Sequence, residues 1–217
     1  MRTEPLATST SAGPEAPPAL AEGDALRAGT YALLGALLAA PPGEDLLERL
    51  RGIGPVTGED GEMAASWQLL LQASAQAAVP HLDDEYHELF VGIGRGELVP
   101  YASWYLTGFL MERPLAVLRR DLAVYGIEAQ DGVTEPEDHA AALCEAMAVV
   151  IQDAGEEGQK AFFDRHLAPW MERFFRDLQE ARSAHFYRAV GRLGEQFIRF
   201  ERQYLDLPAA PADEAPE

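Results

Sequence analysis

Apolar residues recur at helical spacing along almost the whole chain. The segment from 184 to 206 shows this most clearly, because steps of four and three alternate between Phe186, Val190, Leu193, Phe197, Phe200 and Tyr204. Such spacing places all six on one face of a helix. No stretch of four to eight residues has the alternation typical of a strand. The pattern predicts an all-α protein.

Breaks and capping residues divide this pattern into separate helices. Asp24 and Ser103 are candidate N-caps, and Pro114 suits the first turn of a helix. Thr134 and Glu137 form a capping box, which predicts a helix from 134 to about 153. The other helices are expected near 24–40, 45–51, 63–78, 83–91, 103–111, 114–125, 157–166, 169–182 and 184–206. The expected fold is a single-domain antiparallel bundle of about nine or ten helices.

The two ends of the chain differ from its body. Residues 1–22 and 208–217 are rich in Pro, Ala and acidic residues, so we expect disordered tails there. The helical domain is expected to span 23–207. With 217 residues and 47% hydrophobic content, the chain is long and apolar enough to bury a substantial core.

The charge balance is strongly acidic. Thirty-six Asp and Glu face 17 Lys and Arg, which gives a formal net charge of −19. This charge would repel a phosphate backbone and attract a basic ligand, so nucleic acid is not an expected partner. Solubility alone would explain the acidity equally well.

Cysteine content and hydropathy indicate a cytoplasmic protein. The single cysteine, Cys144, lies in an apolar helical pattern and excludes an internal disulfide. Residues 1–18 do not have the basic and apolar regions of a secretory signal. The longest nearly apolar run, 31–42, is about 12 residues, well below the roughly 20 that span a bilayer. No membrane span is therefore predicted.

Signals for catalysis are weak. The segment 92–96 (Gly-Ile-Gly-Arg-Gly) has neither the preceding strand nor the spacing of a dinucleotide-binding loop. Asp84 and His87 supply only half of one motif of a di-metal bundle enzyme. We therefore expect no cofactor, no bound metal and no enzymatic activity, although a metal-dependent bundle enzyme stays open as the least favoured alternative.

Two segments suggest a binding function. Residues 135–139 (Glu-Pro-Glu-Asp-His) place three carboxylates and an imidazole at an expected helix start. Helix capping explains the acids but not His139. Residues 100–105 (Pro-Tyr-Ala-Ser-Trp-Tyr) gather aromatic side chains at another helix start. Aromatic rings beside carboxylates would form a groove for a basic, partly apolar peptide. A helical adaptor for a non-secreted partner is the alternative.

These segments belong to four ordered motifs that resemble the TorD/DmsD/NarJ family of redox-enzyme maturation chaperones, in particular its TorD-like branch. The similarity covers about residues 26–205. It includes an aromatic and acidic helix end at 85–92 (Glu-Tyr-His-Glu-Leu-Phe-Val-Gly), the segment 100–105, the Glu-Pro-x-Asp-His signature at 135–139, and 162–170 (Phe-Phe-Asp-Arg-His-Leu-Ala-Pro-Trp).

The resemblance implies an all-α cytoplasmic chaperone for a molybdenum-containing oxidoreductase. Such a chaperone binds the client's twin-arginine signal peptide and its apo form, and assists cofactor insertion before export. The protein would be a monomer or a helix-exchanged, domain-swapped dimer. Neither the client nor binding of guanine nucleotide or molybdenum cofactor follows from the sequence. The residues expected to contact the signal peptide are Glu85, Phe90, Pro100, Tyr101, Ser103, Trp104, Tyr105, Glu135, Asp138 and His139.

Overall fold

A computed structural model describes residues 20–54, 61–128 and 135–207. Within these ranges the chain forms ten α-helices and two π-helical segments, and no strand. The all-α prediction is therefore confirmed. The helices are α1 (Glu22–Ala39), α2 (Glu44–Gly52), α3 (Glu62–Gln76), α4 (Val79–Tyr86), η1 (His87–Val91), α5 (Ala102–Thr107), α6 (Arg113–Val124), α7 (Ala140–Asp153), α8 (Glu156–Phe162), η2 (Phe163–Leu167), α9 (Met171–Glu180) and α10 (Phe186–Leu205).

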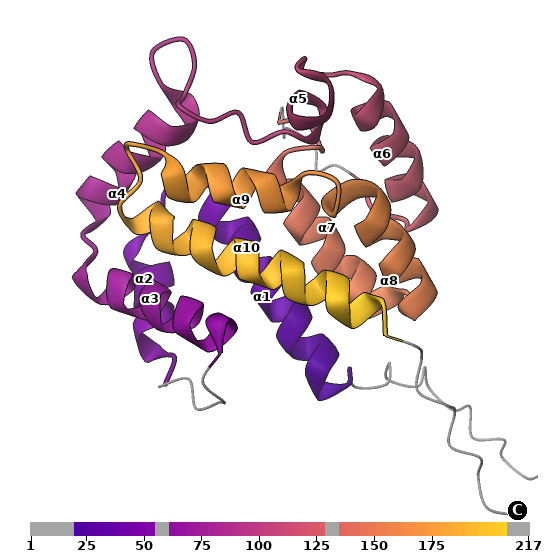
Figure 1. Ribbon diagram of the computed structural model, residues 1–217, viewed down its shortest axis with the longest axis horizontal. Helices are drawn as coiled ribbons and strands as arrows, with labels where there is room; N and C mark the ends of the chain where they lie inside the picture. The colour runs from indigo at the N-terminus through magenta and orange to yellow at the C-terminus, as the bar shows by residue number, and fades with distance from the viewer. Residues whose placement is uncertain (1–19, 55–60, 129–134, 208–217) are drawn as a thin grey trace, which may run out of the picture.

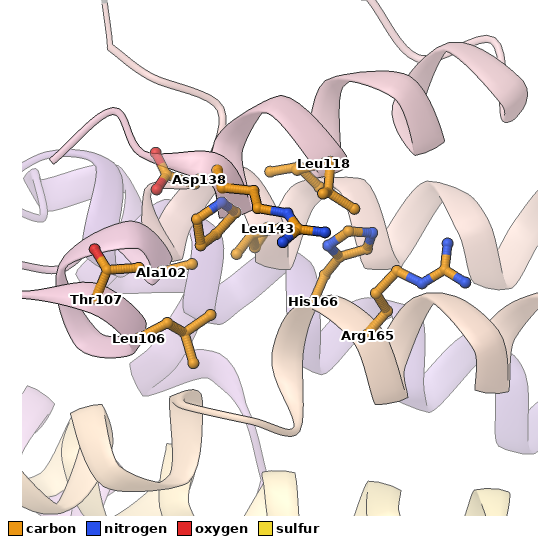
Figure 2. A pocket seen from close by; sticks show the side chains of 11 residues that line it. Ala102, Leu106, Thr107, Leu118, Asp138, Leu143, Arg165 and His166 are labelled. Atoms are coloured by element: carbon orange, nitrogen blue, oxygen red, sulfur yellow. The ribbon is translucent and has the colours of Figure 1, made fainter. Parts of the chain in front are cut away.

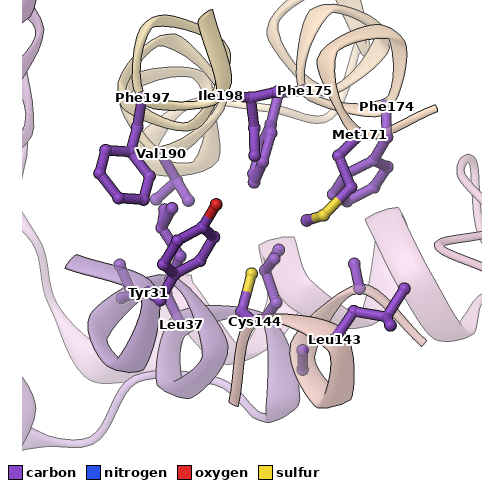
Figure 3. Packing of buried hydrophobic residues seen from close by; sticks show 14 of the residues in the cluster. Tyr31, Leu37, Leu143, Cys144, Met171, Phe174, Phe175, Val190, Phe197 and Ile198 are labelled. Carbon is purple, nitrogen blue, oxygen red and sulfur yellow. The ribbon is translucent and has the colours of Figure 1, made fainter. Parts of the chain in front are cut away.

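Two helix pairs form the centre of the molecule. α1 packs along α7, and α9 packs along α10. In Figure 1, α2, α3 and α4 lie at one end of these pairs, and α5 and α6 lie towards the other. Apolar side chains from both pairs point into the same interior, among them Tyr31, Cys144, Phe175 and Phe197 (Figure 3). Most of the apolar stripe predicted for 184–206 is thus buried, although Phe200 is 41% exposed.

The contact between α9 and α10 depends on a glycine. A Cβ atom on Gly194 of α10 would lie 2.3 Å from the ring of Phe175 on α9. Phe175 is fully buried, so its ring has no space into which to move. The small residue allows the two helices to approach closely.

Several helix boundaries differ from the predicted ones. α1 begins at Glu22, so Asp24 lies inside its first turn rather than at its N-cap. Tyr101, and not Ser103, occupies the N-cap position of α5, so Ser103 lies inside the helix. α5 ends at Thr107 instead of near residue 111. The prediction of Pro114 in the first turn of α6 is confirmed.

The largest error concerns the start of α7. The helix begins at Ala140, with His139 as its N-cap, and not at 134. Glu137 therefore does not belong to a capping box, while Thr134 lies outside the described residues. The helix starts later than predicted because residues 138–140 pair with residues 100–102, far away in the sequence.

Both π-helical segments coincide with motifs seen in the sequence. η1 falls in the 85–92 motif, and η2 falls in the 162–170 motif. A π-helical turn inserts an extra residue into a helix and is frequent at functional sites. No helix within the described ranges has the length and apolar content needed to cross a membrane.

Candidate functional site

The segments 100–102 and 138–140 lie side by side in an antiparallel arrangement. The backbone N–H of Ala102 donates to the carbonyl of Asp138 (2.9 Å), and that of Ala140 donates to the carbonyl of Pro100 (2.8 Å). Tyr101 and His139 face each other in this isolated bridge. Because each segment leads directly into a helix, the starts of α5 and α7 are held together. Two of the sequence motifs thereby form one site.

Asp138 lies at the centre of this site and is only 1% exposed. One carboxylate oxygen, Oδ2, accepts the backbone N–H of Ser103 at 2.8 Å. The other oxygen, Oδ1, has no hydrogen-bond partner within the described part of the chain, and neither has the buried hydroxyl of Ser103. A buried polar atom without a partner costs about 1–3 kcal/mol. A hydrogen-bond donor that reached Oδ1 would therefore stabilise this site.

Tyr101 and Glu135 lie at the exposed edge of the same site. The Tyr101 hydroxyl donates to the carboxylate of Glu135. Its ring meets the His139 ring edge to face, with 5.1 Å between centroids. Desolvation, and secondly the negative charge of Asp138, raise the pKa of Glu135. Glu135 and Asp138 together give this edge a negative potential.

His139 has a structural role that its motif did not reveal. Its Nδ1 accepts the backbone N–H of Ala141 at 3.1 Å and so caps α7. Burial lowers the pKa of His139 to about 4, so the ring is neutral at pH 7. The prediction of a helix from 134, which places Asp138 and His139 inside it, was wrong, because both residues precede α7 and hold the helix starts in place. Their contact with a ligand stays a prediction.

The depressed pKa of His139 predicts a loss of stability in acid. The unfolded chain, with a pKa near 6.5, binds a proton more readily than the fold, so stability is complete above pH 6.5 and falls as the pH approaches 4. Between pH 7 and pH 5 this residue should cost about 2 kcal/mol. In His139→Asn the amide can cap the helix but cannot titrate. Urea titrations at pH 7 and pH 5 measure the free energy of unfolding, and the loss between the two pH values should be smaller by that amount in the variant than in the wild type. An equal loss in both proteins would show that His139 does not cause it.

A pocket of about 290 Å³ opens next to Asp138. Figure 2 shows Asp138 on one side of it and Arg165 and His166 of η2 on the other. Leu118 of α6 and Leu143 of α7 supply apolar wall between them. The side chains of Ala102, Leu106, Thr107, Arg113, Pro114 and Val117 complete the lining.

The charges around this pocket are mixed, whereas the sequence suggested an acidic groove. Arg113 and Arg165 line it together with Asp138. Arg165 and His166 both bond to the carboxylate of Asp121, at 2.9 and 2.7 Å. Burial lowers the pKa of His166 although Asp121 opposes this effect. Arg165, His166 and Asp121 thus form a cluster of opposite charges across the pocket from Asp138 (Figure 2).

Sequence reasoning missed several of these lining residues. His166 belongs to the 162–170 motif, so that motif could have pointed to it. Arg113, Leu106 and Leu118 carry no local signal, because only the packing of α5 against α6 brings them to the pocket.

Trp104 and Tyr105 are half-buried rather than exposed aromatic groups. The guanidinium of Arg95 lies 5.3 Å from the centre of the Trp104 ring. The Tyr105 hydroxyl donates to Asp177 at 3.0 Å, and its ring lies 5.3 Å from that of Trp170. Burial and the charge of Asp177 raise the pKa of Tyr105. These two rings therefore face α9 and the 92–96 loop and do not line the pocket.

Glu85 and Phe90 lie apart from the site. The carboxylate of Glu85 accepts three backbone N–H groups at the start of α10, from His185 (2.8 Å), Phe186 (3.1 Å) and Tyr187 (2.7 Å). Phe90 packs against the rings of Tyr86 and Tyr187. Of the ten predicted residues only Asp138 lines the pocket, and Glu85 is bound to the start of α10 instead.

The other residues considered for chemistry lie in the 92–96 loop, at the junction of α4 and η1, and inside α7. The 92–96 loop is tightly folded: a Cβ on Gly96 would lie 2.5 Å from the Leu89 carbonyl oxygen. Asp84 and His87 do not gain further ligands, since no group of three or more His, Cys, Asp or Glu suited to a metal occurs within the described ranges. Cys144 is buried, and burial raises the pKa of its thiol.

The chain is thus an all-α protein in which two of its four ordered motifs meet at the starts of α5 and α7. Residues 57–176 match the family model described as nitrate reductase delta subunit, and the chain belongs to this family. The resemblance to the TorD/DmsD/NarJ family is thereby confirmed.

Named relatives agree with this family. The chaperone protein TorD of Vibrio cholerae (strain O395) is 27% identical over 143 residues, which cover 60% of this chain and 65% of that protein. The chaperone protein TorD of Shewanella pealeana is 24% identical over 201 residues, which cover 84% of this chain and 91% of that protein. The chain thus spans just under two thirds of the length of the first relative. Both relatives are named as chaperones.

A solved structure shows the same fold. The putative redox enzyme maturation protein from Archaeoglobus fulgidus superposes with a TM-score of 0.52 at 18% identity, covering 90% of this chain and 100% of that chain. At this identity the similarity supports the fold alone.

Proposed function

We propose that this protein is a cytoplasmic chaperone that binds the twin-arginine signal peptide and the apo form of a molybdenum-containing oxidoreductase and assists cofactor insertion before export. One observation carries the proposal: the Oδ1 atom of Asp138 is buried, has no partner within the described residues, and lies beside a pocket where two family motifs meet. Membership in a family with TorD chaperones supports it.

The chemistry of the site suits an arginine-containing peptide. A guanidinium carries five N–H donors in a planar fork, which fits carboxylates such as those of Asp138 and Glu135. The pocket beside them, with Leu118 and Leu143 in its wall, accepts an apolar side chain that follows the arginines. Arg113 also lines the pocket and would repel a second cation there.

Asp138→Asn tests this role without removing the helix contact. The amide oxygen can still accept the Ser103 N–H, while an NH₂ group replaces the acceptor at Oδ1. We expect an unchanged melting temperature and an affinity for a peptide bearing Ser-Arg-Arg-x-Phe-Leu-Lys that is weaker by about 1.5–3 kcal/mol. Fluorescence anisotropy measures the affinity. Asp138→Ala, by contrast, should also destabilise the fold, because it removes the acceptor of the Ser103 N–H.

Two controls make the result specific. Asp84→Asn removes an exposed carboxylate that does not line this pocket and should leave the affinity unchanged. A twin-lysine peptide should bind more weakly than the twin-arginine peptide. If the leader peptide does not bind, or binds Asp138→Asn and wild type equally, the proposal is refuted, and an adaptor for a non-secreted partner becomes the better interpretation.

A further inference from the structure

The turn between α5 and α6 exposes an unusual concentration of apolar side chains. Among residues 106–111, Leu106, Phe109, Leu110 and Met111 are all exposed, Phe109 to 68% and Met111 to 72%. Elsewhere in the described residues, exposed large apolar side chains occur singly or in pairs along the chain. An exposed apolar patch of this kind on a soluble domain marks an interaction site.

The backbone of this turn is built to display these side chains. Met111 has a φ of +58°, and it is the only residue other than glycine with a positive φ within the described ranges. A left-handed conformation costs a side-chain-bearing residue about 1–2 kcal/mol. The Thr107 hydroxyl holds the turn, because it donates to the Ser103 carbonyl (2.7 Å) and accepts the Phe109 N–H (3.2 Å). Strain retained in an ordered turn that exposes Phe109 and Met111 points to a function.

The 106–111 surface continues directly from the candidate site. Leu106 and Thr107 line the pocket that Asp138 also lines. Residues 106–111 carry no charge, whereas Asp138, on the same side of the pocket as Leu106 and Thr107, is a carboxylate (Figure 2). A carboxylate and an uncharged apolar surface thus lie next to each other at the two ends of α5. This arrangement suits an export leader, in which a basic region precedes an apolar region of 7–15 residues.

We infer that the 106–111 surface binds the apolar region of the client's leader, the stretch that follows the two arginines. The inference rests on the proposed function and extends it. With the arginines held near Glu135 and Asp138, the following residues pass the pocket and reach Phe109, Leu110 and Met111. Methionine suits this task because its flexible, polarisable side chain adapts to apolar partners of varied shape. The chaperone would thereby cover the part of the leader that is most prone to aggregate.

Two peptides and one double variant test the inference. The short peptide ends after Ser-Arg-Arg-x-Phe-Leu-Lys, and the long peptide adds the apolar region. We expect the wild type to bind the long peptide about tenfold more tightly than the short one. Phe109→Ser with Met111→Ser should abolish this gain and leave the short-peptide affinity within about twofold. Leu26→Ser, a change at an exposed apolar residue on α1, is the matched control and should preserve the gain.

The outcomes separate the two proposals. If the double variant binds the long peptide as tightly as the wild type does, or loses affinity equally for both peptides, the 106–111 surface does not bind the apolar region. That result leaves arginine recognition at Asp138 intact. If the short peptide does not bind the wild type, arginine recognition itself fails. Light scattering measures the oligomeric state of both proteins. If the wild type is a dimer and the double variant is a monomer, the 106–111 surface serves self-association, and the inference is overturned.

Discussion

Glu201→Met is expected to lower the free energy of unfolding by about 3–5 kcal/mol, because it leaves the guanidinium of Arg27 buried without its main partner. Arg27 on α1 is 3% exposed, and Glu201 on α10 is fully buried. The guanidinium makes a bidentate contact, with Nε to Oε1 at 2.6 Å and Nη2 to Oε2 at 2.9 Å. Glu201 and Asp24 raise the pKa of Arg27 against the effect of burial, so the arginine stays charged. Chemical denaturation measures the loss.

A double variant separates the ion pair from the packing. Arg27→Met with Glu201→Met replaces both charges by apolar groups and should be more stable than Glu201→Met alone, since no unpaired charge remains buried. Glu44→Gln is the control. It removes an ion pair with Arg51 at the surface and should cost less than about 1 kcal/mol. Additive losses in the double variant would show that the pair is not coupled.

Glu85→Ala is the second change with a large expected effect, about 3 kcal/mol of stability. The carboxylate accepts three backbone N–H groups at the start of α10, and a short alanine side chain cannot replace any of these bonds. Helix N-termini also favour a negative charge. Thermal unfolding followed by circular dichroism should show a clear drop in melting temperature.

The matched control lies three residues along the chain. Glu88 is exposed, and Glu88→Ala should leave the melting temperature nearly unchanged. Under conditions where Glu85→Ala remains folded, we expect it to bind the leader peptide with wild-type affinity. A stable Glu85→Ala with weakened peptide binding would restore the sequence-based interpretation of Glu85 as a ligand contact.

The sequence predicted those parts of the fold that local patterns determine. Apolar spacing located α10 and its buried face, and Pro114 marked the start of α6. The start of α7 was not predicted correctly. The local capping pattern at Thr134 and Glu137 favours an earlier start, whereas the long-range pairing of residues 138–140 with residues 100–102 places the start at Ala140. No local pattern reveals such a pairing.

The candidate site was likewise predicted only in part. The motifs identified Tyr101, Glu135 and Asp138, which do lie together, because each motif sits at a helix start that the pairing holds in place. Glu85 carries the same kind of motif signal, yet its carboxylate caps α10 in the structure. A motif therefore shows which residues matter without showing whether they serve the fold or a ligand.

The contact between Arg27 and Glu201 joins residues that are 174 positions apart. During synthesis α1 is made first, and α10 is the last helix of the described chain. Until α10 is released, Arg27 lacks its main counter-charge, and the face of α1 around it cannot be buried without cost. Contacts of such high sequence separation form slowly and late in folding. The turn of α1 around Arg27, unlike the part of that helix that packs on α7, should therefore become protected from hydrogen exchange only after α10 has been made.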